Sequence, residues 1–355
     1  MKKLIFLIIP SILCALFFTG CGPTEAEIAT MTASAWTPTP TPTLTPSPTP
    51  TETQIPIDME IVEELLKPGE IVEHPPTENN PYYFYTYFPR SARSQVNLTV
   101  TVWPHGNGRS NYDYEYHKEK AQQEIPRLKK YSEQYKFPLL VAAVPRVPYR
   151  YITTLVPYTF TTTNDMHYRP DLKLIDAVWN QYIPQLQKAG YIVDEKVFFM
   201  GFSGVSTFSM RFTIIHPELV KAVWLGGSVH APIPASEYNG TEINYPVGVN
   251  DLEELTGKPF NLEVYKTVPH MIVIGEDDTN PQHDVTDFRE CYSVADANFI
   301  RSNFGKTQVE RARFFYEYLV SIGVPAKFSL HAGIGHEFTE GMIVGAFLFF
   351  KSHKD

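Results

Sequence analysis

The chain has 355 residues, a formal net charge of −9 and 43% hydrophobic residues, which is the composition of a globular protein with a substantial core. This acidic balance, with no basic stripe in the sequence, argues against a nucleic-acid partner. Three cysteines are too few for a disulfide-rich scaffold.

The first twenty residues predict an export signal. Lys2 and Lys3 precede an apolar run over residues 4–18, which is short for a bilayer core of about 30 Å and typical of a signal peptide. The following Thr-Gly-Cys21 resembles the lipobox of bacterial lipoproteins, although Phe18 stands where that family usually has an aliphatic residue. The resemblance implies a signal peptide over 1–20, lipidation of Cys21 and an exported protein at the cell surface or outer leaflet. A plain signal peptide and a cytosolic chain with an apolar tail are the alternatives.

A linker follows the lipidated N-terminus and extends to residue 56. Seven prolines and eight threonines fall between Thr37 and Pro56, and proline fixes φ and removes a hydrogen-bond donor. The segment is therefore expected to be an extended stalk or a disordered tail, at most ~60 Å long. We predict a lead-in segment over 57–80 and a single catalytic domain over 81–355.

Strand-like and helix-like segments alternate through this domain. In chain order they are strands 82–88 and 96–103, helix 111–135, strand 139–144, helix 171–189, strand 196–200, helix 204–216, strands 222–225 and 271–274, helix 307–322, strand 326–330 and helix 339–350. Pro126 and Pro184 are expected to kink or break the helices that contain them. The alternation predicts an α/β fold, a mostly parallel sheet with helices on both faces. Residues 228–267, rich in Pro, Gly and Asn, are predicted to be an insertion near the mouth of a site.

The most informative motif is Gly201-Phe202-Ser203-Gly204, which joins an apolar strand directly to a helix. A serine on such a sharp turn is exposed above the sheet at a helix N-terminus, where it can act as a nucleophile. Val205 departs from the G-x-S-x-G pattern, which has glycine two residues after the serine. A tight structural turn without catalytic function is the alternative interpretation.

A nucleophilic serine needs a base and an acid that orients the base. The strand at 271–274 leads into Gly275-Glu276-Asp277-Asp278, and the strand at 326–330 leads to a histidine between glycine and glutamate, His336. We predict Asp278 as the acid, with Asp277 as the alternative, and His336 as the base. His331 and His336 are a weak candidate for a metal pair, because no carboxylate ligand accompanies them at suitable spacing; the predicted chemistry needs no cofactor or metal.

A loop after the strand at 96–103 is the candidate oxyanion hole. The strand ends in Pro-His105-Gly106-Asn107-Gly108, whose glycines allow backbone N–H groups to face a substrate. We predict that the N–H groups of Gly106 or Asn107, together with that of Gly204, bind the oxyanion.

Together these motifs resemble the α/β-hydrolase superfamily of serine esterases. The resemblance places the nucleophile elbow on residues 201–205, the oxyanion loop on 105–108, the acid on Asp278 and the catalytic histidine on His336. The stretch from His216 to Val223 is similar to that of secreted feruloyl esterases and polyhydroxyalkanoate depolymerases. It implies a serine esterase that acts on small-molecule or polymeric esters, of carbohydrate or polyester type. A serine peptidase of the same fold and a non-catalytic surface protein that binds glycan or cell wall are the alternatives. Val205 favours the last, because a crowded elbow would misplace Ser203.

Overall fold

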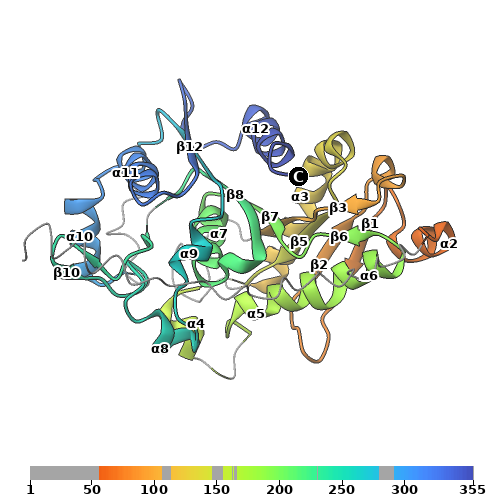
Figure 1. The fold of residues 1–355 in the computed structure, drawn as a ribbon, viewed down its shortest axis with the longest axis horizontal. Coiled ribbons are helices and arrows are strands. Elements are labelled where there is room, and N and C mark those ends of the chain that lie inside the picture. Colours follow the sequence, from red (N-terminus) through yellow and green to blue (C-terminus); the bar gives the residue numbers. More distant parts are fainter. Residues whose placement is uncertain are drawn as a thin grey trace, which may run out of the picture. The chain divides into compact units, whose positions relative to one another are not determined.

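The computed structural model describes residues 56–105, 113–145, 155–161, 163, 166–229, 231–279 and 292–354 (Figure 1). The chain divides into two units, 1–53 and 54–355, and all described residues belong to the second. The predicted signal peptide, Cys21 and the Thr/Pro-rich linker up to residue 55 lie outside the described residues.

An eight-stranded sheet forms the centre of the domain, in the order β1-β2-β5-β4-β7-β8-β11-β12. Every neighbouring pair from β5 to β12 is parallel, and only β2 runs antiparallel to both of its neighbours. The strands are β1 (Ile71–His74), β2 (Phe84–Tyr87), β4 (Thr101–His105), β5 (Leu139–Ala143), β7 (Val197–Phe202), β8 (Val220–Gly226), β11 (His270–Gly275) and β12 (Ala326–His331). The predicted fold class, a mostly parallel α/β sheet, is confirmed.

Helices cover both faces of the sheet. The helices are α2 (Met59–Ile61), α3 (Tyr114–Tyr135), α4 (Pro157–Thr161), α5 (Pro170–Ile175), α6 (Ile183–Lys188), α7 (Gly204–Ile215), α8 (Leu252–Thr256), α9 (Leu262–Tyr265), α10 (Val294–Asn303), α11 (Gln308–Ser321) and α12 (Glu340–Lys351). One apolar cluster joins the sheet to α3 and α12, which lie side by side (Figure 1). The other joins the opposite face to α6, α7 and α11. Alternate residues of β7 enter the two clusters, because side chains alternate between the faces of a strand.

Two expectations about the elements are corrected by the structure. The strand predicted over 96–103 is divided: β3 (Asn97–Leu98) pairs with β6 (Ile192–Val193) in a separate two-stranded sheet, and β4 joins the main sheet. Of the two effects expected of Pro126, the structure excludes the break, because α3 is continuous from 114 to 135. Both Pro126 and Gln122, whose carbonyl loses its helical partner, lie on the exposed side of the helix, where water can replace the missing donor.

The helix predicted over 171–189 changes its winding in the middle. A π-helical segment, η3 (Asp176–Tyr182), separates α5 from α6, and Pro184 lies in the first turn of α6. A proline has no N–H to donate, so the regular α-helical hydrogen bonding is interrupted here while the helical winding continues.

Residues 57–80, predicted as a lead-in, carry the edge strand of the main sheet. After α2 and the π-helical turn η1 (Val62–Leu66), β1 pairs with β2 over four residues. Val62 and Leu66 are buried in the larger core cluster.

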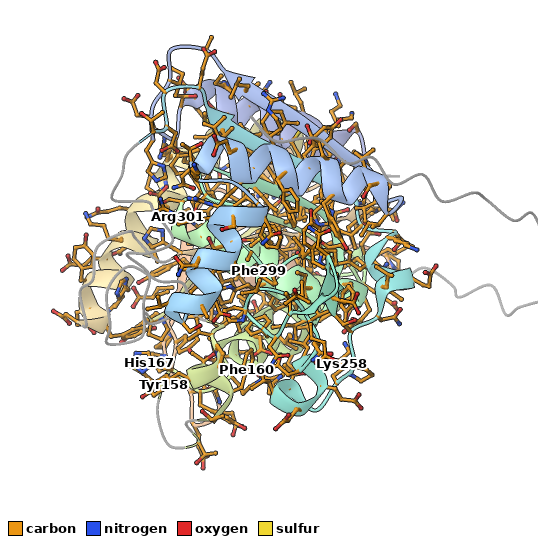
Figure 2. The ribbon with its side chains drawn as sticks, turned by 90° about the vertical axis from the view of Figure 1, so that its left-hand side faces the viewer. Tyr158, Phe160, His167, Lys258, Phe299 and Arg301 are labelled. Carbon is orange, nitrogen blue, oxygen red and sulfur yellow. The ribbon has the colours of Figure 1, made fainter. Side chains whose placement is uncertain are left out.

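The segment over 228–267, predicted as an insertion, contains short elements rather than continuous loop. They are the hairpin β9 (Glu237–Tyr238) and β10 (Thr241–Glu242), followed by α8 and α9. α8 contacts α4, which comes from the connection between β5 and β7. Figure 2 looks at this side of the domain, with Phe160 of α4, Lys258 after α8 and Phe299 of α10 labelled. Within the described ranges, none of the helices combines the length and apolar character needed to cross a membrane.

A buried charged network connects the end of α7 to α5. Asp171 has no exposed side-chain surface and accepts hydrogen bonds from the Arg169 guanidinium at 2.8 Å and from His216 Nε2 at 2.9 Å. His216 Nδ1 lies 3.6 Å from Glu218, which also pairs with Lys258 of the insertion. Burial alone would lower the pKa of His216, but the bonds to Asp171 and Glu218 outweigh it and raise that pKa above its usual value of 6.5.

This network predicts a pH-dependent contribution to stability. Because the folded-state pKa of His216 is raised, its contribution is complete below pH 6.5 and is lost as the pH rises from 6.5 through the folded-state value. His216→Gln should therefore remove the part of the stability that the wild type loses as the pH rises through this range. Urea unfolding at several pH values measures it, with His353→Gln, a half-buried histidine outside the network, as control. Equal pH dependence in wild type and His216→Gln would contradict the assignment.

Candidate active site

Ser203 occupies a strained turn between β7 and α7. Its φ is +58° and its ψ −130°, a conformation that a residue with a side chain rarely adopts. The Ser203 N–H donates to the carbonyl of Gly226 in β8 at 2.8 Å, and the Ser203 carbonyl accepts from Ser206 N–H at 2.9 Å. The turn is thus fixed on one side by the sheet and on the other by the helix.

Gly201 permits the close approach of strand and helix at this turn. A Cβ at position 201 would lie 2.4 Å from the carbonyl oxygen of Val205, so no other residue fits without displacing the helix backbone. The side chain of Val205 is 4% exposed and belongs to the core cluster under α3 and α12. The departure from glycine at position 205 therefore does not crowd the elbow, because the valine side chain is accommodated in the core.

The structure brings together Ser203, Asp278 and His336, although 75 residues separate Ser203 from Asp278 and 58 separate Asp278 from His336 along the chain. His336 Nε2 lies 2.8 Å from Ser203 Oγ, and His336 Nδ1 lies 2.7 Å from Asp278 Oδ2. With the proton on Nδ1, the imidazole donates to the carboxylate and accepts from the serine hydroxyl. The Asp278 side chain is fully buried, whereas 20% of the His336 side chain is exposed.

Backbone contacts join the acid loop to the histidine loop. The N–H groups of Glu276 and Asp277 donate to the carbonyls of His331 and Ile334, both at 2.9 Å. A Cβ at Gly275 would lie 2.2 Å from the Ile334 carbonyl oxygen, so a glycine is required for this approach. The two loops are consequently held in register at the ends of the adjacent strands β11 and β12.

The neighbouring acidic residues occupy different positions. Glu276 and Asp277 are exposed, while Asp278 is buried at the imidazole. Asp278 is thus the carboxylate that contacts His336, and Asp277, the alternative acid, contributes its backbone to the loop contact. His331, the last residue of β12, contributes its carbonyl as an acceptor to the same contact between the loops.

Only part of the predicted oxyanion site falls within the described residues. Gly204 is the first residue of α7, and the first N–H groups of a helix have no acceptor within it. It therefore offers a donor next to Ser203 Oγ. Gly106 and Asn107 lie outside the described residues; His105 before them is buried at the end of β4 and accepts a hydrogen bond from Trp103 Nε1 at 3.3 Å.

An aromatic cluster next to His336 was not predicted from the sequence. The ring centroids of Phe202 and His336 are 5.2 Å apart, and those of Phe202 and Phe338 are 5.1 Å apart in a stacked arrangement. The sequence signals that point to this cluster are Phe202, directly before Ser203, and Phe338, two residues after His336. The pair Gly226-Gly227 is a third signal. Among the described residues, no group of three or more His, Cys, Asp or Glu is placed to share a metal ion.

The strand order, the strained strand-to-helix turn and the chain order Ser, Asp, His define an α/β-hydrolase fold. No protein-family model matches the chain, and no curated protein matches it. Its similarity to solved structures is distant: a Pyrobaculum calidifontis esterase shares 15% identity at a TM-score of 0.44, over 83% of this chain and 87% of that one. An S-formylglutathione hydrolase from Agrobacterium tumefaciens shares 12% identity at a TM-score of 0.43, over 80% of this chain and 93% of that one. Carboxyl esterase 2 from Tuber melanosporum shares 15% identity at a TM-score of 0.42, over 80% of this chain and 84% of that one.

Gly201→Ala tests the close approach at the elbow. The new methyl group would lie 2.4 Å from the Val205 carbonyl oxygen, so we expect a loss of about 1–3 kcal/mol of unfolding free energy. Gly345→Ala is the matched control, because position 345 lies within α12 and a Cβ there meets no atom within 4 Å. It should be neutral or stabilising by up to about 1 kcal/mol. Thermal unfolding of both variants measures the difference, and equal stabilities would contradict the steric explanation.

Proposed function

We propose that this protein is a serine hydrolase that cleaves carboxylic esters through an acyl-enzyme. The observation that carries the proposal is the continuous hydrogen-bonded series from Ser203 Oγ through His336 to Asp278, with distances of 2.8 and 2.7 Å. A hydroxyl next to an imidazole base, which is oriented by a buried carboxylate, is the arrangement that activates serine as a nucleophile.

In the acylation step, Ser203 Oγ attacks the ester carbonyl carbon while His336 Nε2 accepts the hydroxyl proton. The negative charge that develops on the carbonyl oxygen is stabilised by the N–H of Gly204 and by a second N–H from the loop of Gly106 and Asn107. The tetrahedral intermediate then breaks its bond to the alcohol oxygen, which takes the proton from His336. Asp278 keeps the imidazole in the required tautomer and stabilises its protonated form.

In the deacylation step, His336 takes a proton from water, and the resulting hydroxide attacks the acyl carbon. The bond to Ser203 Oγ breaks, the serine recovers its proton from His336, and the carboxylic acid leaves. These steps consume only the ester and water, and every other group that takes part belongs to the protein.

The proposal extends to the setting of the enzyme and to its substrates. The apolar N-terminus with Cys21 and the Thr/Pro-rich linker favour an exported, lipid-anchored enzyme on a stalk, at the cell surface or outer leaflet of a bacterium. Small-molecule or polymeric esters, of carbohydrate or polyester type, are the proposed substrates. Specificity is expected from residues 149–169 and 228–267, which follow β5 and β8 at the end of the sheet where Ser203 lies.

Substitution of the three side chains tests the proposed chemistry. Ser203→Ala and His336→Ala should each lower kcat for an aryl acetate by about 10⁴-fold or more, and Asp278→Asn by a similar factor. Asp277→Asn is the matched control, since that carboxylate is exposed, and it should retain kcat within about twofold. Wild-type activity that survives in Ser203→Ala would refute the mechanism, and activity lost in Asp277→Asn but kept in Asp278→Asn would assign the acid to Asp277.

The choice of substrate separates an esterase from a peptidase. A panel of acetyl, butyryl and feruloyl esters, a polyester and peptide anilides should show turnover of esters and none of the anilides. Faster turnover of anilides would favour the peptidase instead. A protein that turns over neither, yet binds an insoluble glycan, would favour the non-catalytic alternative.

A further inference from the structure

Phe202 lies against the imidazole of His336 and is seated on two glycines. Its ring lies over the end of β8, where a Cβ at Gly227 would come within 2.6 Å of the ring and a Cβ at Gly226 within 3.0 Å. Gly227 also has a φ of +70°, which disfavours other residues. The ring that faces the His336 imidazole is thus fixed by a backbone shape that only glycine provides.

Phe338 stacks against Phe202 and also contacts two tryptophans. Its ring stacks on Trp103 of β4 at 5.2 Å and lies 5.7 Å from Trp224 of β8. Both tryptophans are buried in the sheet, so they form a rigid support. Phe338 is two residues from His336 in the same loop, and its ring position therefore limits where the loop can lie.

Arg127 of α3 covers Phe338 from outside the sheet. Its guanidinium carbon lies 4.4 Å from the centroid of the Phe338 ring, and its Nη2 donates a hydrogen bond to the Phe338 carbonyl. One side chain thus holds both the ring and the backbone of the same residue. Glu124, one turn earlier on α3, lies 3.9 Å from Arg127 Nη1 and offers a counter-charge.

These contacts complete the attachment of the histidine loop. On the side before His336, the loop is held by the backbone bond from Asp277 to Ile334. On the side after it, Arg127 holds Phe338, and Tyr131 of the same helix donates to Glu340 at the start of α12 at 2.7 Å. His336 lies between these two attachments, and the imidazole must meet both Ser203 and Asp278 at once.

We propose that Arg127 is a positioning residue of the hydrolase: acting through Phe338 and Phe202, it holds the His336 imidazole in line between Ser203 and Asp278. The inference rests on the proposed function. An exposed charge by itself contributes little to stability. A positioning role explains why Arg127 nevertheless contacts the loop twice, although its side chain is 40% exposed. A planar guanidinium, which lies over the ring while it donates to the backbone, suits this task better than a lysine, which offers a point charge on a flexible stem.

The experiment compares three variants of the full chain on one aryl ester. Arg127→Met keeps the apolar stem and loses the cation, and Arg127→Lys keeps the cation. Lys130→Met removes the charge of an exposed neighbour on α3, which pairs with Glu340 of α12. We expect Arg127→Met to lower kcat about tenfold, less than the roughly 100-fold loss that a 1 Å misplacement can cause, with KM within about twofold. Arg127→Lys should recover at least half of the loss on a logarithmic scale, and Lys130→Met should stay within about twofold of wild type.

A second readout follows the imidazole itself. In the wild type, the Nδ1 proton of His336, which bonds to Asp278, should give a far-downfield proton NMR signal, and this signal should weaken in Arg127→Met and be kept in Lys130→Met. The proposal is overturned if Arg127→Met has wild-type kcat and signal, if Lys130→Met loses as much kcat, or if KM rises while kcat holds. A wild type that hydrolyses no ester would instead contradict the proposed function. The NMR signal alone would then test whether Arg127 positions the His336 imidazole.

Discussion

The backbone at Ser203 is the constraint around which the site is arranged. A φ of +58° is unfavourable for serine, and it is maintained because the hydrogen bond to Gly226 holds the turn against β8 while α7 starts immediately after it. Gly201 lets the two backbones meet at a distance that any Cβ would prevent. The turn points the serine oxygen at the end of the sheet, where the loops after β11 and β12 place the imidazole 2.8 Å from it.

Burial decides which carboxylate belongs to the site. Three acidic residues follow one another after β11, and sequence position alone cannot rank them. Asp278 is fully buried and bonded to the imidazole, whereas Glu276 and Asp277 are exposed and donate backbone N–H groups to the histidine loop. A buried carboxylate keeps its bond to His336 free of competition from water, which strengthens the orientation of the base. The exposed pair instead ties the two loops together.

Much of the fold was predictable because the main-sheet strands are short apolar runs and the helices between them are amphipathic, so β5, β7, β11, α7 and α12 fall close to their predicted ranges. The chain order of Ser203, Asp278 and His336 was readable for the same reason, since each follows a recognisable strand. The division of residues 96–103 was not predictable, because it depends on pairing with β6, nearly a hundred residues away. Nor was the role of Arg127, whose partner Phe338 is 211 residues distant. The effect of Pro126 was not predictable either, because it depends on which face of α3 meets water.

The nucleophilic role of Ser203 is tested most directly by a fluorophosphonate probe, followed by peptide mass spectrometry of the labelled protein. Such a probe phosphonylates a serine only where a base activates it and an oxyanion site receives the developing charge. The predicted result is one label per chain, on the peptide that contains Ser203, which disappears when the protein is unfolded before labelling. A folded wild type that takes up no probe, or a label on another residue, would contradict the assignment of Ser203 as the nucleophile.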